Sequence, residues 1–286
     1  MVANMESNRV RLARTRNLVK AALHGLDGLA YPAPADGLAV LVYHRVVSGI
    51  PKELAIPPRM FRRQIRFLIE NYPIVHPDRL LSGGEIRNGV LLTFDDGYED
   101  FGQTVLPILR EFGAPALLYL CSQRLLDGGY HWFDNDLPPE RKRLLRGDDA
   151  RRLCDSGLVV IGSHTRTHRR VTELADGDLL EEIAGSRAEL ERITGQTVPH
   201  FAYPQAEWDE RTELIVGRHY RTAVIGGYRR NPGAFNPLRL FRIGIQQSDS
   251  ERVFRWKVSG ELRLLHLMSR ARHRPLGWLR ETVPAA

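Results

Sequence analysis

The sequence predicts an α/β fold with about seven buried strands, most of them parallel. Short and almost continuous apolar runs recur along the chain, at residues 38–44, 89–96, 114–121, 157–164, 198–204, 220–227 and 238–245. Their length and β-branched content are typical of strands that are covered on both faces, as in a parallel sheet. Helical patterns separate most of the runs. This alternation fits either a barrel or an open doubly wound sheet.

The helices are predicted from apolar residues that repeat at helical spacing. In "FRRQIRFLIENY" the side chains of Phe61 and Leu68 share one face with others of the same pattern. A longer pattern, "DLLEEIAGSRAELERITG", stops at Gly195, and glycine is the residue that most often ends a helix. By the same argument we expect helices to end at Gly113 and Gly157.

The chain is predicted to be one main domain with an appendage at each end. Residues 1–37 form a basic helix and a linker, residues 38–246 form the main domain, and residues 247–286 form a helix and a tail. Residues 122–148 are polar and contain glycine and proline, so they are interpreted as a surface insertion and not as a second domain.

The composition restricts the function classes. The chain of 286 residues is 43% hydrophobic and 26% charged, which is ordinary for a soluble globular protein. Its formal charge of +7 comes almost entirely from arginines that are scattered over the helices, which disfavours a nucleic-acid interface. Such a surface suits solvent, acidic glycans or anionic lipid head groups. Two cysteines imply neither a disulfide framework nor a thiolate zinc site.

The N-terminal segment is basic and lacks the apolar core of a signal peptide. In "NRVRLARTRNLVKAALHGL" charges interrupt the hydrophobic residues, and nothing in the chain is long and apolar enough to span a membrane. We interpret the segment as an amphipathic helix with Val10, Leu18 and Leu26 among its apolar members. It packs on the domain or docks on a membrane surface. The expected location is therefore cytoplasmic, with membrane association if the helix docks.

Polar side chains follow several of the predicted strands at the point where each strand ends. They are His44, the pair Asp95 and Asp96, His164, and Tyr203. Because the carboxyl ends of parallel strands meet at one edge of a sheet or barrel, these residues are expected to converge, although they come from distant parts of the chain.

The stretch "LLTFDDGYED" and the stretch "GSHTRTH" together predict a metal site. Adjacent buried carboxylates such as Asp95 and Asp96 repel each other unless a cation or hydrogen bonds compensate them. His164 and His168 are four residues apart, so on a helical turn both imidazoles would reach one ion. Two imidazoles and one carboxylate make a three-ligand site for Zn²⁺ or a similar ion, with a position left open for water. The second carboxylate could then accept a proton from that water.

The motifs "TFDDGYED", "GSHTRTH" and "FAYP", in this order, resemble those of the polysaccharide deacetylase family, also called the NodB-homology group or carbohydrate esterase family 4. The resemblance covers roughly residues 38–246. It implies a distorted (β/α) barrel of about seven parallel strands. It also implies a metal-dependent hydrolase that removes an N-acetyl or other N-acyl group from an amino sugar of a polysaccharide, oligosaccharide or lipid-linked glycan. Zn²⁺ is the expected ion, and Co²⁺ or Ni²⁺ also suits such ligands.

The resemblance assigns a role to each residue that matches a motif. By the first motif, Asp95 would be the general base and Asp96 a metal ligand. By the second, His164 and His168 would complete the metal triad. By the third, Tyr203 lies in the loop whose backbone N–H stabilises the oxyanion of the tetrahedral intermediate.

Two features depart from the family pattern. The third motif, "HFAYPQAEW", has no arginine to orient the catalytic aspartate, and Ala206 stands where a variant of the motif has glycine. Arg242, in "LFRIGI", either supplies that charge from another strand or lies on the surface. The general acid is assigned to His44, because it ends a buried strand and a subset of the family carries this histidine early. His266, in "LLHL", matches the usual motif by letters only.

Other functions stay open at this point. A deformylase acting on a lipid-linked amino sugar and a cyclic-amide hydrolase would keep the same fold and metal. A catalytically inactive glycan-binding module is disfavoured because every metal and base residue of the motifs is present. Nucleic-acid binding is the weakest alternative. Tyr130 and Trp132 in the insertion either stack against sugar or anchor the loop.

Overall fold

Seven parallel strands form a closed barrel in the computed structural model, which describes residues 2–30, 36–129 and 134–262. In spatial order the strands are β1 (Gly37–Tyr43), β4 (Gly89–Phe94), β5 (Ala116–Leu120), β6 (Val159–Ser163), β7 (His200–Ala202), β8 (Thr222–Gly227) and β10 (Leu240–Gly244). The barrel closes because β10 pairs with β1, with Arg242 opposite Val40. The predicted fold class is confirmed, and of the two predicted arrangements the barrel is the one observed.

Three very short strands lie outside the barrel sequence. β2 (Arg45–Val46) and β3 (Ala55–Ile56) form a separate two-stranded sheet directly after β1. β9 (Asn231–Pro232) pairs antiparallel with the first residues of β1.

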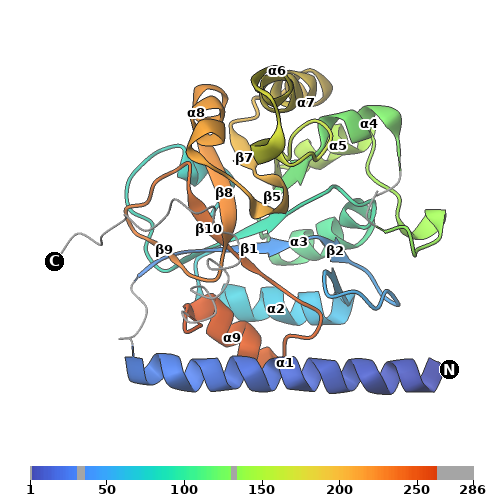
Figure 1. Ribbon diagram of the computed structural model, residues 1–286, viewed down its shortest axis with the longest axis vertical. Coiled ribbons are helices and arrows are strands. Elements are labelled where there is room, and N and C mark those ends of the chain that lie inside the picture. Colours follow the sequence, from blue (N-terminus) through green and yellow to red (C-terminus); the bar gives the residue numbers. More distant parts are fainter. Residues whose placement is uncertain (1, 31–35, 130–133, 263–286) are drawn as a thin grey trace.

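Helices surround the barrel (Figure 1). Those between successive strands are α2 (Pro58–Asn71), α3 (Leu106–Phe112), α4 (Ser122–Asp127), α5 (Gly147–Cys154), α6 (Asp176–Leu180), α7 (Ser186–Thr194) and α8 (Glu210–His219). Two π-helical segments, η2 (Phe101–Val105) and η5 (Glu181–Gly185), lead directly into α3 and α7. Short 3₁₀ turns are η1 (Pro77–Leu80), η3 (Pro139–Arg141), η4 (Val171–Glu173) and η6 (Pro204–Ala206).

The predicted helix ends are found in two of three places. Gly113 ends α3 and Gly195 ends α7, each in the left-handed conformation that suits glycine. The helix expected to end at Gly157 ends earlier, at Cys154, and Gly157 is a left-handed residue of the turn that follows.

Alternate residues of the strands face two separate apolar cores. On β1, Leu41 and Tyr43 belong to the larger core between the barrel and its helices, whereas Leu38 and Val40 belong to a smaller core inside the barrel. On β4, Leu91 faces the inner core in the same way. This is the period of two that strand geometry imposes, and it decides which residues beyond the strand ends face the barrel axis.

The N-terminal helix is present as α1 (Val2–Ala30), which lies beside α9 (Glu251–Ser259) on the outside of the barrel (Figure 1). It packs on the domain through polar residues: Lys20 is buried, whereas Leu18 and Leu26 are 70% and 55% exposed. Leu18 and Leu26, which the sequence predicted to be apolar members of this helix, therefore do not lie on the packed face. Among the described residues, no helix is both long and apolar enough to cross a bilayer.

Some predictions concern parts of the chain outside the described residues. These are the aromatic residues Tyr130 and Trp132 of the insertion, the histidine His266, and the C-terminal tail from residue 263 onwards. The rest of the insertion contains α4 and η3, and its Asp134 is buried against Tyr98, whose hydroxyl donates a 2.7 Å hydrogen bond to it.

Candidate metal centre

Asp96, His164 and His168 form a buried cluster at the carboxyl end of the barrel strands. One ligand atom of each lies within 4.8 Å of the others. Oδ1 of Asp96 is 3.8 Å from Nε2 of His164 and 3.7 Å from Nε2 of His168. In a tetrahedral zinc site, ligand atoms about 2.1 Å from the ion would be roughly 3.4 Å apart, so the cluster needs only a small contraction. The donor set and its spacing fit a divalent metal ion.

Two backbone contacts orient His164. Its own N–H donates to the carbonyl oxygen of Leu120 at 2.9 Å, and its Nδ1 lies 2.8 Å from the carbonyl oxygen of Ala202. Because a carbonyl oxygen only accepts, Nδ1 carries the ring proton and Nε2 keeps a lone pair. That lone pair faces the carboxylates, which is the arrangement of metal-binding histidines whose other nitrogen is held by a backbone carbonyl.

The two histidines meet in an irregular loop, and the prediction that a helical turn brings them together is wrong. Thr165 and His168 have φ angles of 66° and 65°, in the left-handed region. The N–H of His168 donates to Oγ1 of Thr165 at 2.9 Å, which closes the loop. The imidazole rings of His164 and His168 lie edge to face, with centroids 4.7 Å apart. Left-handed residues other than glycine carry strain and are common at functional sites.

Glu182 holds this loop from the opposite side, and the sequence reasoning missed it. Its Oε2 accepts hydrogen bonds from the backbone N–H groups of Arg166 and Thr167, at 3.0 and 2.8 Å, and its Oε1 accepts from the Thr167 hydroxyl. Glu182 is buried and belongs to the π-helical segment η5. Such segments often occur at functional sites. The sequence around Glu182 gives no indication of this role, because its contacts with Arg166 and Thr167 form only in the folded chain.

Asp95 lies beside the cluster and is paired with Arg242. The Nη1 of Arg242, on β10, donates to Oδ1 of Asp95 at 2.6 Å, and both side chains are buried. The other oxygen, Oδ2, is 3.8 Å from Nε2 of His164. Burial alone would raise the pKa of Asp95, but the positive charge of Arg242, with smaller effects of His164 and His44, outweighs it and lowers the pKa. Arg242 is therefore inside the site and not on the surface.

His44 follows β1 and faces the same group of charges. Its Nδ1 is buried and has no hydrogen-bond partner among the residues that the structure describes. Burial lowers the pKa of His44 below its usual value, and the negative charges of Asp96 and Asp95 oppose this only in part. The imidazolium of His44 would therefore be a stronger acid than that of free histidine.

The strand period explains why these side chains converge. His44, Asp95 and Arg242 each follow a member of the inner core on their own strand by an even number of residues, and His164 follows Val160, which packs against that core, by four. Each therefore points toward the barrel axis at the carboxyl end, where parallel strands bring residues from distant segments together.

Tyr203 follows β7, but its backbone is already engaged. Its N–H donates to the carbonyl oxygen of Val224 at 3.3 Å, and its side chain is fully buried against the edge of Phe201, with ring centroids 5.0 Å apart. In this conformation the N–H is part of the β7 to β8 pairing. Its assignment to the oxyanion stays a prediction. The next residues, Gln205 and Ala206, are left-handed, with φ angles of 56° and 60°.

The sequence matches known proteins along most of the barrel. The model of the polysaccharide deacetylase family matches residues 83–224. The chain is 25% identical over 203 residues to YxkH of Bacillus subtilis (strain 168), described as a polysaccharide deacetylase, across 69% of this chain and 66% of that protein. It is 28% identical over 170 residues to the poly-beta-1,6-N-acetyl-D-glucosamine N-deacetylase of Escherichia coli (strain K12), across 52% of this chain and 24% of that enzyme. The chain thus spans about two thirds of the length of YxkH and about one quarter of the length of the Escherichia coli enzyme.

Solved structures share the fold. The Streptococcus pyogenes deacetylase PplD, in complex with acetate, superposes with a TM-score of 0.68 at 22% identity. The aligned region covers 79% of this chain and 99% of the PplD chain. IcaB from Ammonifex degensii superposes with a TM-score of 0.65 at 22% identity. The aligned region covers 80% of this chain and 98% of the IcaB chain. At these identities the likeness concerns the fold.

Proposed function

The chain belongs to the polysaccharide deacetylase family, and from this premise we propose that it is a metal-dependent hydrolase that removes an N-acetyl group from an amino sugar of a glycan. One observation carries the proposal: the cluster of Asp96, His164 and His168 is buried next to a separate carboxylate, Asp95, that Arg242 holds in place. This provides ligands for one ion and a base that does not have to bind it.

Asp96, His164 and His168 are the residues that would hold the ion. A bound divalent metal would polarise the amide carbonyl and make a water molecule more acidic. Zn²⁺ is the proposed ion, because two imidazole nitrogens and one carboxylate oxygen with an open position are typical of catalytic zinc, although Co²⁺ and Ni²⁺ accept the same donors.

The residues around the cluster perform the proton transfers in this proposal. Asp95 accepts a proton from the attacking water, and Arg242 keeps it ionised and oriented. His44, in its protonated form, then gives a proton to the departing amine and becomes neutral. The Tyr203 N–H would donate to the oxyanion, which requires that its 3.3 Å bond to Val224 be given up first.

The proposed substrate is an N-acetylated amino-sugar glycan. The Escherichia coli relative is named for poly-beta-1,6-N-acetyl-D-glucosamine, so oligomers of N-acetylglucosamine are the first substrates to test. Release of formate, measured in parallel with acetate, distinguishes a deformylase from a deacetylase. The cytoplasmic location inferred from the sequence stays a prediction.

The proposal is tested by metal content and acetate release from the purified protein. We expect Asp95→Asn to keep its metal and to lose turnover by roughly 10²–10⁴-fold, the usual contribution of a general base. His164→Ala should lose both metal and activity, whereas His76→Ala, which changes an exposed histidine on the N-terminal side of η1, should lose neither. Near-normal turnover of Asp95→Asn would show that another group is the base. A metal-loaded wild type that releases no acyl group from any of these glycans would refute the proposed activity.

A further inference from the structure

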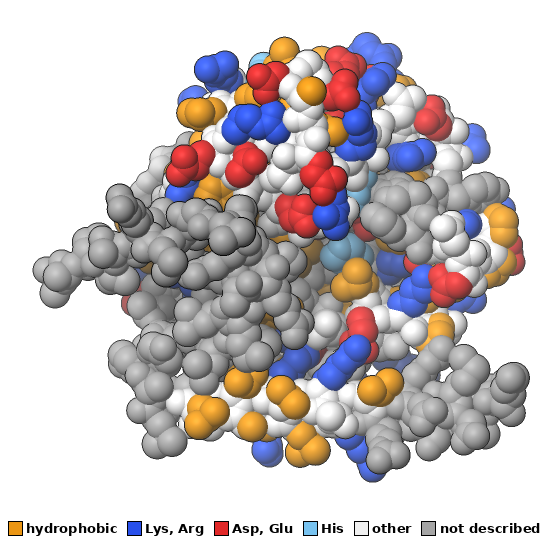
Figure 2. Space-filling view, viewed as in Figure 1, with side chains coloured by type: hydrophobic (Ala, Val, Ile, Leu, Met, Phe, Trp, Pro, Cys, Tyr) orange, Lys and Arg blue, Asp and Glu red, His pale blue; other side chains and the backbone are white. Residues whose placement is uncertain are grey.

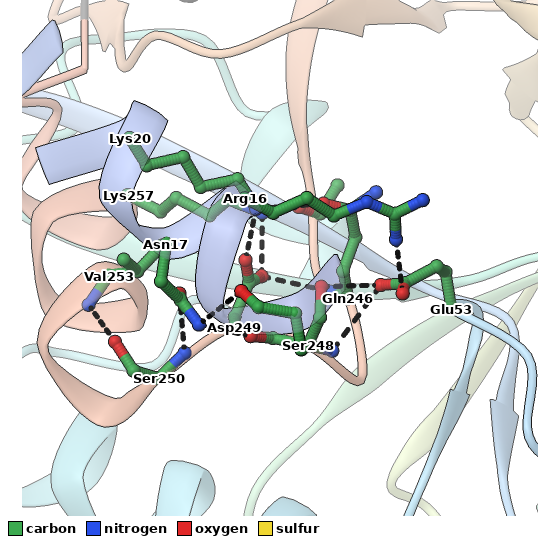
Figure 3. A network of polar contacts seen from close by, with 12 residues as sticks. Arg16, Asn17, Lys20, Glu53, Gln246, Ser248, Asp249, Ser250, Val253 and Lys257 are labelled. Carbon is green, nitrogen blue, oxygen red and sulfur yellow. Dashed lines mark hydrogen bonds and ion pairs between the residues drawn. The ribbon is translucent and has the colours of Figure 1, made fainter. Parts of the chain in front are cut away.

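A buried network of charges fixes α1 on the domain. Nζ of Lys20 is 2.5 Å from Oδ1 of Asp249, and Nζ of Lys257, on α9, is 2.6 Å from Oδ2 of the same carboxylate (Figure 3). Lys20 also donates to the side-chain oxygen of Gln246 at 2.9 Å. All three charged side chains are buried. Because a buried ammonium needs its carboxylate, the contact determines which side of α1 faces the domain.

Other polar contacts lie along the same side of the helix. Nδ2 of Asn17 donates to the carbonyl oxygen of Ser248 at 2.8 Å. Nε2 of His24 is 2.7 Å from Oε2 of Glu261, and its ring stacks on Trp256 with centroids 3.9 Å apart. Together with Lys20, these residues recur at spacings of three and four, so they occupy one face of the helix.

The opposite face of α1 exposes four large apolar side chains. Exposed side chains there are Leu12 (58%), Leu18 (70%), Val19 (51%) and Leu26 (55%). Figure 2 shows hydrophobic side chains in a row along this helix at the bottom of the view. A helix on the surface of a globular domain ordinarily turns its apolar stripe inward and its polar residues outward. In α1 the arrangement is reversed, and the leucines are left without cover by the described residues.

The charge around this face indicates what covers it. α1 contains four arginines and a lysine against two acidic residues, Glu6 and Asp27, which lie near its ends. Arg14 is exposed, and Arg16 reaches across to pair with Glu53. A second copy of this chain would bring equal charges together. An exposed apolar face on a helix with this excess of positive charge is instead complementary to a bilayer that contains anionic lipids.

We propose that α1 is a membrane-surface anchor. Leu12, Leu18, Val19 and Leu26 enter the boundary between head groups and acyl chains of an anionic bilayer, while Arg14 contacts lipid phosphates. The inner face of the helix, through Lys20 and its partners, holds the barrel to that surface. Binding of this kind is independent of hydrolysis, so it succeeds or fails separately from the proposed activity.

The test is co-sedimentation of the full-length protein with lipid vesicles. We expect binding to vesicles of equal parts phosphatidylcholine and phosphatidylglycerol, much weaker binding to phosphatidylcholine alone, and release by added salt. The double variant Leu18→Glu, Leu26→Glu should lose at least roughly tenfold in partitioning. Leu214→Glu is the matched control, because this leucine of α8 is 67% exposed and lies away from α1. It should bind as the wild type does.

Other outcomes would overturn the proposal. Thermal melting and circular dichroism establish that each variant is folded. If the folded double variant binds anionic vesicles as well as the wild type, or if the wild type binds no better to anionic than to neutral vesicles, α1 is not a lipid anchor. If light scattering shows a dimer that the double variant dissociates, a second copy covers the apolar face.

Discussion

The guanidinium of Arg242 donates a 2.6 Å hydrogen bond to Oδ1 of Asp95, although 147 residues separate the two in the sequence. Both side chains are buried, and the pKa of the carboxyl group is lowered: burial opposes its ionisation, but the charge of Arg242 outweighs that effect. Arginine remains charged at any physiological pH, so the pair keeps Asp95 ionised and fixes its direction.

Replacing the arginine should impair turnover without removing metal. In Arg242→Met the carboxylate loses its charged partner, and we expect kcat for acetate release to fall roughly 10²–10³-fold, as when one preorganised donor is lost. Metal content should be unchanged, because the hydrogen bond goes to Asp95 and not to the cluster of Asp96, His164 and His168.

The control for this variant is Arg239→Met. Arg239 lies just before β10, and its Nε pairs with Glu213 on α8 at 2.6 Å, away from the metal cluster. Turnover should be that of the wild type. If Arg242→Met lost its metal, or if both arginine variants lost equal activity, Arg242 would be supporting the fold and not the base.

Glu182 should determine how tightly the histidine loop binds metal. Glu182→Gln weakens the acceptor that holds the N–H groups of Arg166 and Thr167, so His168 is less well positioned. Loss of such outer contacts typically costs 10–100-fold in affinity, and we expect a decrease of about this size for Zn²⁺ in a chelator competition assay. Glu181→Gln, which changes an exposed neighbour on the same π-helical segment, is the control. Equal affinities in the two folded variants would contradict this role.

Much of the barrel could be predicted because its evidence is local. A strand covered on both faces needs a run of apolar residues, and the polar residue that ends each run marks the edge where the site forms. His44, Asp95 and His164 were found in this way. Arg242 stayed undecided because its sequence neighbours do not show that Asp95 lies next to it. Glu182 was missed for the same reason, since its partners Arg166 and Thr167 come from another segment.

The local conformation of the ligand loops and the rotation of α1 could not be predicted from spacing. His164 and His168 are four residues apart, which is compatible with a helix, but Thr165 adopts a left-handed conformation. In α1 the alternation of leucine and arginine predicts an amphipathic helix without saying which side is inward. That choice depends on Asp249, a buried carboxylate more than two hundred residues away that attracts Lys20.

The left-handed conformation of Ala206 should be removable at little functional cost. Its φ of 60° is strained for alanine and free for glycine, the residue that a variant of this motif carries. We expect Ala206→Gly to raise the free energy of unfolding by about 1 kcal/mol, with acetate release unchanged. Denaturant titration measures the first quantity. Ala188→Gly, at an exposed position inside α7, should do the opposite and lower it by about 1 kcal/mol. Equal losses in both variants would mean that Ala206 is unstrained.

Asp249 should be the least replaceable residue of the α1 contact. Asp249→Asn leaves the ammonium groups of Lys20 and Lys257 buried without a carboxylate, so we expect a loss of about 3–5 kcal/mol in the free energy of unfolding. Lys20→Met removes one charge and keeps the pair of Asp249 with Lys257, and it should cost about 1 kcal/mol or less. Chemical denaturation at neutral pH measures both changes.

The pH dependence of this loss gives an independent check. Burial lowers the pKa of Lys257 to about 8, from 10.5, although the charge of Asp249 opposes the shift. The folded state therefore releases this proton before the unfolded state does, so the contribution of Lys257 to stability rises with pH between these two values. Without the carboxylate the pKa falls further, and Asp249→Asn should begin to recover stability at a lower pH than the wild type does. An Asp249→Asn variant whose deficit stays constant from neutral pH to pH 10 would show that Lys257 is not buried as an ammonium ion.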